Sequence, residues 1–348
     1  MKERSSTKII CTIGPSTSSA DQLKKMLING MSVARINLSH STQKEISLIV
    51  KNIRSVEKET GHSILIALDT RGNELRISCK EKKDILDGDY IKIVKSMQFD
   101  EEENIHKIGV NLKSFEFVKT GTKITFDDNK LSGEVIQSED TFLIVKALNS
   151  HLLENNKRIY IPDLPECSSM QVQDCEDIRF GILEGINMVF LSFVESKSQL
   201  IECRKLIKDK PVQIISKIES LRGFKAIEDI FSFSDGIMIA RGDLLNDVGV
   251  DCMFSMQKML VYACKSKPMI MATEMLSSMV NRGFPTRSEI SDIGNAVMDG
   301  CSAVMLSEET ANGKYPLESI DVMRRVCIDA ERLRANLRSK KTTESSNK

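Results

Sequence analysis

Eight short apolar segments recur along the 348-residue chain, and most of them are continuous rather than alternating. They occupy residues 8–12, 32–37, 64–69, 188–193, 213–218, 236–240, 269–273 and 303–306. Continuous apolar runs of this length are typical of strands buried on both faces of a parallel sheet. Helix-like stretches separate them, at 19–29, 41–60, 172–183, 197–208, 254–266, 287–298 and 317–333. The pattern predicts an α/β fold, a (β/α)₈ or TIM barrel, with an open doubly wound sheet as the competing arrangement.

Residues 78–160 interrupt this alternation because they contain no amphipathic helix. Short β-like runs lie there instead, at 89–95, 123–126, 130–136, 141–147 and 158–161, separated by turn signals. We expect a small all-β domain inserted after the third barrel strand, on the face where a barrel keeps its active site, where it would act as a lid. The barrel would then comprise residues 1–77 and 161–336, followed by a loose polar tail at 337–348.

The composition argues against several classes of function. Lys plus Arg and Asp plus Glu both number 49, so no basic surplus favours nucleic acid binding. No apolar stretch approaches the ~20 residues of a membrane span, and the N-terminus lacks the apolar core of a signal peptide. The nine cysteines form no CxxC pair and no zinc spacing with histidine, which indicates reduced thiols in a cytoplasmic protein. We therefore expect neither nucleic acid nor a membrane as a partner.

Polar side chains gather where five of the predicted strands end. They are Arg35, Asn37, Ser39 and His40 after the second strand, Asp69, Thr70, Arg71, Glu74 and Arg76 after the third, Lys217 and Glu219 after the fifth, Arg241, Gly242 and Asp243 after the sixth, and Thr273 and Glu274 after the seventh. Any one of these alone is more often a solvated charge or a turn former than a catalytic group. Their convergence at the carboxyl ends of barrel strands favours an active site.

The residue types indicate provisional roles. Glu219 and Asp243 follow adjacent strands and together suit one Mg²⁺, whose shell is completed by substrate oxygens and water. A second set, with neutral oxygens and one carboxylate, suits a monovalent cation by its charge: Asn37, Ser39, Asp69 and Thr70. The cationic side chains would face an anionic, phosphorylated substrate: Arg35, Arg76 and Lys217. Gly242 allows close approach of the backbone, whose N–H groups would hold a carboxylate.

These segments together resemble the pyruvate kinase family. The matching stretches are TKIICTIGPST (7–17), ARINLSH (34–40), ALDTRGNELR (67–76), FGILEGINMVFLSFV (180–194), IISKIES (214–220), DGIMIARGDL (235–244), MATEMLSSM (271–279), PTRSEISDIGNAVMDG (285–300) and MLSEETANGKYPLES (305–319). Their order and spacing fit nearly all of residues 7–330, whereas the inserted domain resembles the family's B domain mainly in position and in FDD at 126–128. The resemblance implies a phosphotransferase of glycolysis that transfers the phosphoryl group of phosphoenolpyruvate to ADP, giving pyruvate and ATP.

The resemblance also implies roles for single residues. Glu219 and Asp243 match the family's ligands for Mg²⁺ (or Mn²⁺), and its K⁺ ligands match Asn37, Ser39, Asp69 and Thr70. Lys217 matches the lysine that steadies the transferring phosphoryl group and the enolate, and Thr273 matches the threonine near the carbon that is protonated. The backbone donors for the substrate carboxylate match Gly242 and Asp243. The nucleotide and phosphate side matches Arg35, Asn37, His40 and Lys157, and Glu74 matches a glutamate that accompanies K⁺ dependence.

The chain departs from the family pattern at single positions and in extent. Arg71 stands where lysine is usual, Asn73 where proline is usual, and Leu245 and Glu308 where glycine is usual. The family's C-terminal effector domain has no counterpart after the predicted barrel, so we expect no response to fructose bisphosphate and a homodimer through the barrel near 285–292. One alternative is a weakly active or inactive paralogue that binds and regulates a full-length pyruvate kinase. Another is a Mg²⁺-dependent lyase, which Lys217 and the K⁺ set disfavour.

Overall fold

The computed structural model describes residues 2–95, 105–112, 114–127, 129–162, 164 and 168–346. The chain forms two compact units, one of Met1–Gly72 with Ser168–Lys348 and one of Asn73–Cys167. The second unit is wider than the insertion expected at 78–160. In it Ile77 donates its N–H to the carbonyl of Lys157, and Arg76 bridges to Arg158, so residues just before the expected insertion pair with residues near its end.

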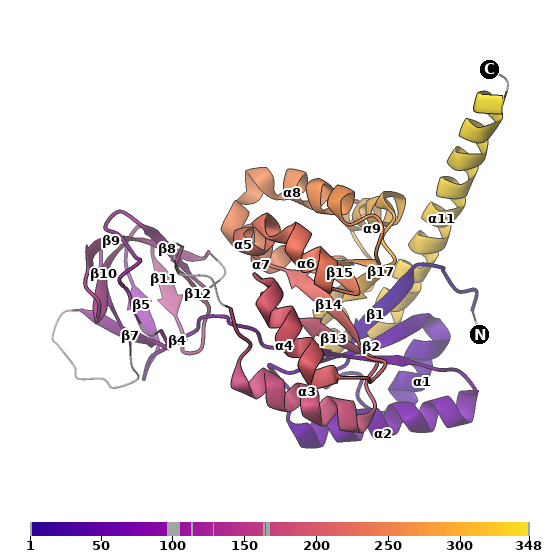
Figure 1. Ribbon diagram of the computed structural model, residues 1–348, viewed down its shortest axis with the longest axis horizontal. Coiled ribbons are helices and arrows are strands. Elements are labelled where there is room, and N and C mark those ends of the chain that lie inside the picture. Colours follow the sequence, from indigo (N-terminus) through magenta and orange to yellow (C-terminus); the bar gives the residue numbers. More distant parts are fainter. Residues whose placement is uncertain are drawn as a thin grey trace. The chain divides into compact units, whose positions relative to one another are not determined.

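The larger unit contains a closed barrel of parallel strands in the order β1-β17-β16-β15-β14-β13-β3-β2 (Figure 1). The strands are β1 (Lys8–Thr12), β2 (Met31–Asn37), β3 (Leu65–Asp69), β13 (Met188–Leu191), β14 (Gln213–Ile218), β15 (Gly236–Ala240), β16 (Met269–Ala272) and β17 (Ala303–Leu306). The predicted α/β barrel is confirmed, and the open sheet is wrong because β1 pairs with both β2 and β17. β13 and β16 end earlier than predicted, and Phe193 and Thr273, just beyond them, have φ values of 49° and 77°.

Helices follow the barrel strands, and many of these helices begin or end at residues that favour a helix terminus. They are α1 (Ala20–Asn29), α2 (Gln43–Thr60), α3 (Val172–Glu184), α4 (Lys197–Ile207), α5 (Leu221–Lys225), α6 (Ile227–Phe233), α7 (Arg241–Val248), α8 (Val250–Ala263), α9 (Arg287–Asp299), α10 (Glu308–Ala311) and α11 (Pro316–Ser346), with a 3₁₀ turn η1 (Ser277–Val280). Capping boxes begin α2 at Thr42 and α9 at Thr286, and a glycine follows each helix, Gly61 and Gly300.

The C-terminal helix corrects one expectation. Residues from 337 onward were expected to be a loose tail, but α11 continues to Ser346 and projects from the barrel (Figure 1). Residues 331–338 read ERLRANLR and are mostly strong helix formers, and the stretch that follows contains neither proline nor glycine to end the helix. None of the helices among the described residues is both long enough and apolar enough to cross a membrane.

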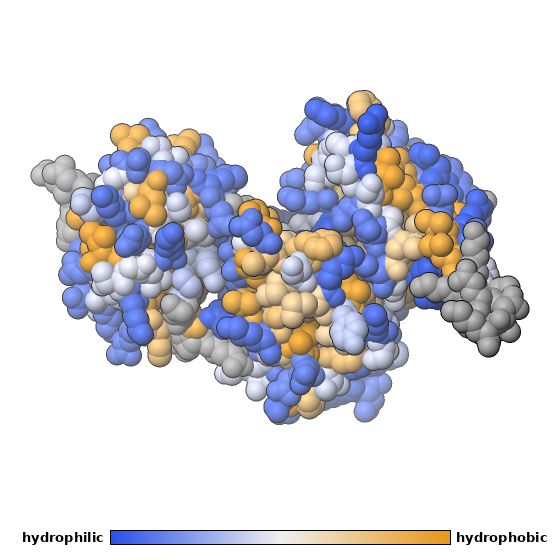
Figure 2. Space-filling model, turned by 90° about the horizontal axis from the view of Figure 1, so that it is seen from above, coloured by the Kyte–Doolittle hydropathy of each residue, from blue (hydrophilic) through white to orange (hydrophobic). Residues whose placement is uncertain are grey.

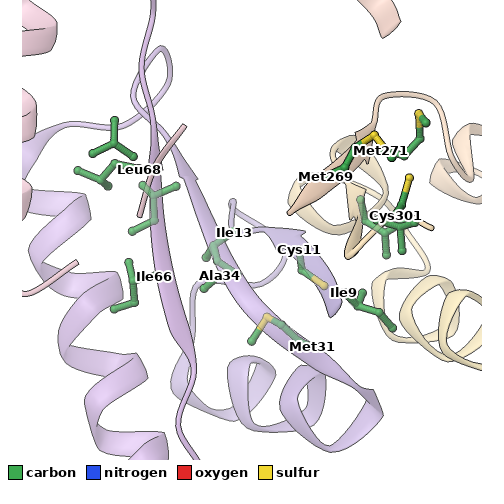
Figure 3. Close-up of a cluster of buried hydrophobic side chains, with 14 of the residues drawn as sticks. Ile9, Cys11, Ile13, Met31, Ala34, Ile66, Leu68, Met269, Met271 and Cys301 are labelled. Atoms are coloured by element: carbon green, nitrogen blue, oxygen red, sulfur yellow. The ribbon is translucent and has the colours of Figure 1, made fainter. Parts of the chain in front are cut away.

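Apolar side chains fill both faces of the barrel wall. One buried cluster draws on every barrel strand and fills the interior: Ile10, Val33, Ala67, Phe190, Ile215, Met238, Ile270, Ala272, Ala303 and Met305. Neighbouring strand residues point the other way and join helix residues such as Leu23 and Met26 in a larger cluster. Figure 3 shows part of it: Ile9, Cys11, Ile13, Met31, Ala34, Ile66, Leu68, Met269, Met271 and Cys301. Burial on both faces is why the strands are continuous apolar runs.

The smaller unit is built from β-strands in its described residues. Its sheet has the order β12-β8-β9-β10-β6-β7-β4, and β5 pairs with β11. The strands are β4 (Ile77–Ser78), β5 (Lys83–Ile85), β6 (Tyr90–Val94), β7 (His106–Val110), β8 (Lys123–Phe126), β9 (Leu131–Ser138), β10 (Phe142–Ala147), β11 (His151–Leu153) and β12 (Ile159–Tyr160). The predicted β-rich insertion after the third barrel strand is confirmed, although β4, β5, β7 and β11 were not predicted. In the view of Figure 2, hydrophilic and hydrophobic side chains are interspersed over the molecular surface.

Candidate active site

Three predicted site residues from separate barrel strands meet at the carboxyl ends of those strands. Asp69 ends β3, and its Oδ2 accepts a hydrogen bond from Nε of Arg35 on β2 at 2.6 Å. Its Oδ1 accepts one from Nζ of Lys217 on β14 at 2.8 Å. Arg35 also donates from Nη1 to Oγ1 of Thr12, at the end of β1 (2.7 Å). Arg35 and Lys217 are 8% exposed and Asp69 is 1% exposed, so this ion-pair network is buried.

Ser192 completes this network, although the sequence did not single it out. It follows β13, which lies between β3 and β14 in the barrel. Its Oγ accepts a hydrogen bond from Nζ of Lys217 (2.8 Å) and lies 3.0 Å from Oδ1 of Asp69 and 2.6 Å from the carbonyl of Thr70. The available signal was modest: Ser192 is the polar residue in the apolar run MVFLSFV (188–194).

Glu219 joins the same group from the residue after β14. Its Oε1 lies 3.0 Å from Nζ of Lys217, and its Oε2 accepts a hydrogen bond from the N–H of Phe193 at 2.8 Å. The positive φ of Phe193 turns the chain sharply after β13 and accompanies this bond. We call Arg35, Asp69, Ser192, Lys217 and Glu219 the Lys217 cluster.

Mutual charge interactions decide the ionisation of this cluster. Burial alone would raise the pKa of Asp69, but the charges of Arg35 and Lys217 outweigh it and hold that pKa below its ordinary value. Burial alone would lower the pKa of Lys217, but Asp69 and Glu219 outweigh it and raise the pKa, so the ammonium keeps its charge. Burial raises the pKa of Glu219 despite the opposing charge of Lys217, and the charge of Asp243 adds to this rise.

The donors expected to hold a monovalent cation lie on adjacent chain segments. Asn37 and Asp69 are register partners at the ends of β2 and β3, and Leu38 donates its N–H to the carbonyl of Asp69 at 2.9 Å. Oδ1 of Asn37 accepts the N–H of Ser39 at 3.1 Å. Thr70 is buried, and its Oγ1 accepts the N–H of Ser192 at 2.9 Å. Register therefore brings the segments of Asn37, Ser39, Asp69 and Thr70 together.

His40 lies at the end of this turn. Its N–H bonds the carbonyl of Asn37 at 3.2 Å, and both Ser39 and His40 are exposed.

The ends of β15 and β16 bring Gly242 and Thr273 into contact. A Cβ added to Gly242 would lie 2.8 Å from Cγ2 of Thr273, so the methyl group packs directly on the glycine backbone. Gly242 and Asp243 lie in the first turn of α7, where backbone N–H groups have no partner inside the helix. Such amides suit a carboxylate or phosphate ligand.

Three predicted site residues belong to the smaller unit. Glu74 accepts hydrogen bonds from Arg76, 2.7 Å from Nη2 and 2.9 Å from Nε, and Arg76 also donates from Nη1 to the carbonyl of Asn156 at 2.7 Å. Nζ of Lys157 lies 3.1 Å from Oδ1 of Asp127.

The donor chemistry fits a hard divalent cation held by few protein ligands. In the described part of the chain, no three His, Cys, Asp or Glu side chains form a metal-binding group. Mg²⁺ usually takes only one or two protein carboxylates. Burial is the largest cause of the raised pKa of Glu219, and the negative charge of Asp243 adds to it, so a cation held by both carboxylates would favour their ionised forms.

Comparison of the sequence with known proteins agrees with a barrel of this kind. The family model described as "Pyruvate kinase, barrel domain" matches residues 4–320. The chain belongs to the pyruvate kinase family. It is 41% identical to the pyruvate kinase of Encephalitozoon cuniculi over 94% of this chain and 76% of that protein. It is 38% identical to the Dictyostelium discoideum enzyme (93% and 66%) and 37% identical to the Geobacillus stearothermophilus enzyme (97% and 60%). The chain therefore spans from three-fifths to three-quarters of the length of these pyruvate kinases.

The positions that depart from the family pattern lie outside the Lys217 cluster. Arg71 pairs through its guanidinium with Asp177, and its N–H bonds Asp174, both carboxylates lying on α3. Leu245 is partly buried within α7, and Glu308 is exposed at the start of α10.

Proposed function

We propose that this chain is a pyruvate kinase, transferring the phosphoryl group of phosphoenolpyruvate to ADP to give pyruvate and ATP. One observation carries the proposal: a buried ammonium, Lys217, held between Asp69, Ser192 and Glu219 at the carboxyl ends of the barrel strands. Phosphoryl transfer needs positioning and charge neutralisation rather than a covalent intermediate. A fixed cation in a buried site supplies this without reorganising during the reaction.

Some of the proposed residues bind the substrate, and others stabilise the charge that develops on it during phosphoryl transfer. Lys217 and Arg35 face the phosphoryl group, and Lys217 also stabilises the enolate that remains when the phosphoryl group leaves. The N–H groups of Gly242 and Asp243 bind the substrate carboxylate at the start of α7. Thr273, packed against Gly242, lies near the carbon that is protonated.

Two cation sites are part of the proposal. Glu219 and Asp243 would hold Mg²⁺ or Mn²⁺, which when bound neutralises and orients substrate oxygens. The K⁺ site would be formed by Asn37, Ser39, Asp69 and Thr70. The carboxylate of Asp69 is already paired with Arg35 and Lys217, so its side chain adds little free negative charge there, which suits a monovalent ion.

On the barrel, the residues proposed for the nucleotide are Arg35, Asn37 and His40. In the smaller unit, Lys157 is the residue proposed for it. Lys157 is paired with Asp127, so a nucleotide phosphate would compete with that carboxylate for the ammonium. Arg76 would face the anionic substrate with its positive charge. Glu74, which accepts a hydrogen bond from Arg76, is the glutamate whose presence would accompany dependence of the activity on K⁺.

A coupled assay tests the proposal. Pyruvate formed from phosphoenolpyruvate and ADP is reduced by added lactate dehydrogenase, and NADH loss is followed with Mg²⁺ and with K⁺ or tetramethylammonium as counter-ion. We expect turnover that requires Mg²⁺, stops on chelation with EDTA and falls sharply without K⁺. Absence of turnover in a folded sample given both ions would refute the proposal and favour the alternative, a regulatory partner of a full-length pyruvate kinase.

We further propose a cytoplasmic homodimer that forms through the barrel near residues 285–292. Sedimentation velocity across a concentration series tests the dimer. A single monomeric species at micromolar concentration would refute it.

A further inference from the structure

The chain after β16 adopts a backbone conformation that its residues disfavour. Thr273 has a φ of 77° and Glu274 a φ of 57°, and neither is a glycine. A β-branched residue in the left-handed region is a clear outlier because its side chain crowds the backbone. Such a conformation persists only where the surrounding structure holds it, and it is found preferentially at functional sites.

The side chain of Arg241 makes several contacts with this segment. Arg241 is the first residue of α7, after β15, and its guanidinium reaches across to the neighbouring strand β16. Nη2 donates to the carbonyl of Thr273 at 2.6 Å and lies 3.1 Å from Sδ of Met275, while Nε lies 3.3 Å from the carbonyl of Ala272. The side chain of Arg241 thus bonds the carbonyls of Ala272 and Thr273, which belong to the two peptide groups that flank the left-handed residue Thr273.

Asp292 fixes the guanidinium from the opposite side. It lies on α9, and its Oδ1 and Oδ2 are 2.8 and 2.7 Å from Nη1 of Arg241. The side chains are 15% and 29% exposed, so the pair is largely removed from water. A lysine could pair with the carboxylate, but its single ammonium lacks the planar fork that serves Asp292 and Thr273 at once.

We propose that Arg241, held by Asp292, is a positioning residue that keeps Thr273 in its left-handed conformation and so sets where its side chain meets the substrate. The proposal rests on the proposed function, in which Thr273 lies near the reacting carbon. The γ-methyl group of Thr273 packs on Gly242, at the end of α7 that would bind the substrate carboxylate. Release of Arg241 would therefore change the placement of Thr273 relative to the amides of α7.

A purely structural ion pair between α7 and α9 would make different predictions. It would lower stability when broken, but it would leave kcat and the environment of Thr273 unchanged in the molecules that remain folded. A positioning role predicts a lower kcat with little change in KM, because small misplacements of a reacting group cost one to two orders of magnitude in rate.

The test compares Arg241→Lys and Asp292→Asn with a matched control, Arg324→Lys. Arg324 on α11 is 10% exposed in its side chain and pairs with a 25% exposed Asp321 at 2.8 Å, so it reproduces the burial of the Arg241 pair. Each variant receives threonine labelled with ¹³C at the γ-methyl, and Thr273→Ser assigns the Thr273 signal. We expect the Thr273 methyl signal to shift or broaden in both test variants, with kcat about tenfold lower and KM for phosphoenolpyruvate within about threefold.

The outcomes separate the two proposals. An unchanged Thr273 signal in both test variants, or a moved signal with unchanged kcat, overturns the positioning role. Equal effects of Arg324→Lys on kcat also overturn it. If the wild-type protein shows no turnover and the Thr273 signal still moves in both test variants, the holding of Thr273 by Arg241 is supported and the proposed function is refuted. Asp292→Asn keeps the shape of the side chain, so the test remains decisive if Arg241→Lys does not fold.

Discussion

Replacing Lys217 by methionine tests the central feature of the site. Methionine fills a similar length of the buried space but lacks the ammonium that Asp69, Ser192 and Glu219 share at 2.8, 2.8 and 3.0 Å. Asp69 keeps Arg35 as a cationic partner. Glu219, which is 2% exposed, loses the cation that offsets its burial.

The structure sets the size of both expected effects. Breaking a buried ion pair by removing one partner typically costs about 3–5 kcal/mol of unfolding free energy. Only one of the two carboxylates is left without a cation, so we expect the lower end, about 3 kcal/mol. Loss of a preorganised electrostatic group should lower kcat by about 10²–10³. The variant therefore folds, with a clearly lower urea midpoint and a nearly abolished coupled-assay rate.

A double substitution separates the two effects. Lys217→Met with Glu219→Gln removes the uncompensated charge, so its urea midpoint should recover part of the loss seen in Lys217→Met. Its activity should not recover, because Glu219 is also the proposed Mg²⁺ ligand. Lys258→Met is the matched control: it breaks a partly exposed pair with Asp299 at 2.7 Å, which we expect to cost at most about 1 kcal/mol.

Two results would refute this reasoning. If Lys217→Met retained activity within about threefold of the wild type, the ammonium would not be the group that stabilises the transferring phosphoryl. If the double variant were no more stable than Lys217→Met, the loss would not come from a buried unpaired carboxylate.

Other parts of the molecule allow further predictions. Ser192→Ala removes a buried hydroxyl that bonds Lys217, Asp69 and the carbonyl of Thr70, so it should cost about 1–3 kcal/mol in urea unfolding and lower kcat by about tenfold or less, and a rate loss equal to that of Lys217→Met would contradict the auxiliary role. Gly14→Ala places a Cβ 2.6 Å from a backbone oxygen and should cost about 1–3 kcal/mol in urea unfolding, whereas Gly294→Ala, with open space in α9, should gain about 0.5–1 kcal/mol. Burial raises the pKa of Glu309, so stability falls as pH rises from the ordinary carboxyl pKa through the raised one, and a pH series of urea midpoints should lack that fall in Glu309→Gln.

Much of the barrel was predictable because its signals are local. Each strand is a run of apolar residues buried on both faces, and helix starts such as Thr42 and Thr286 carry their capping residues within three positions. The smaller unit was harder, since β4 and β5 have only two and three residues and are defined by pairing with the distant strands β7 and β11. The length of α11 was missed because its polar, serine- and threonine-rich end indicated a loose tail, whereas the helix continues from the helix formers at 331–338.

The residue types at the strand ends and their order along the chain were determined by the sequence alone, and they indicated a barrel acting on an anionic, phosphorylated substrate. Which of them touch was decided only by the tertiary structure. Lys217 and Asp69 are 148 positions apart, and barrel closure brings them to 2.8 Å. The roles of Ser192 and Arg241 were also decided by the tertiary structure, because their hydrogen-bond partners lie on neighbouring strand ends that are far away in the sequence. The left-handed conformation of Thr273 likewise has no local signal, since it is imposed by contacts from Arg241 on another strand end.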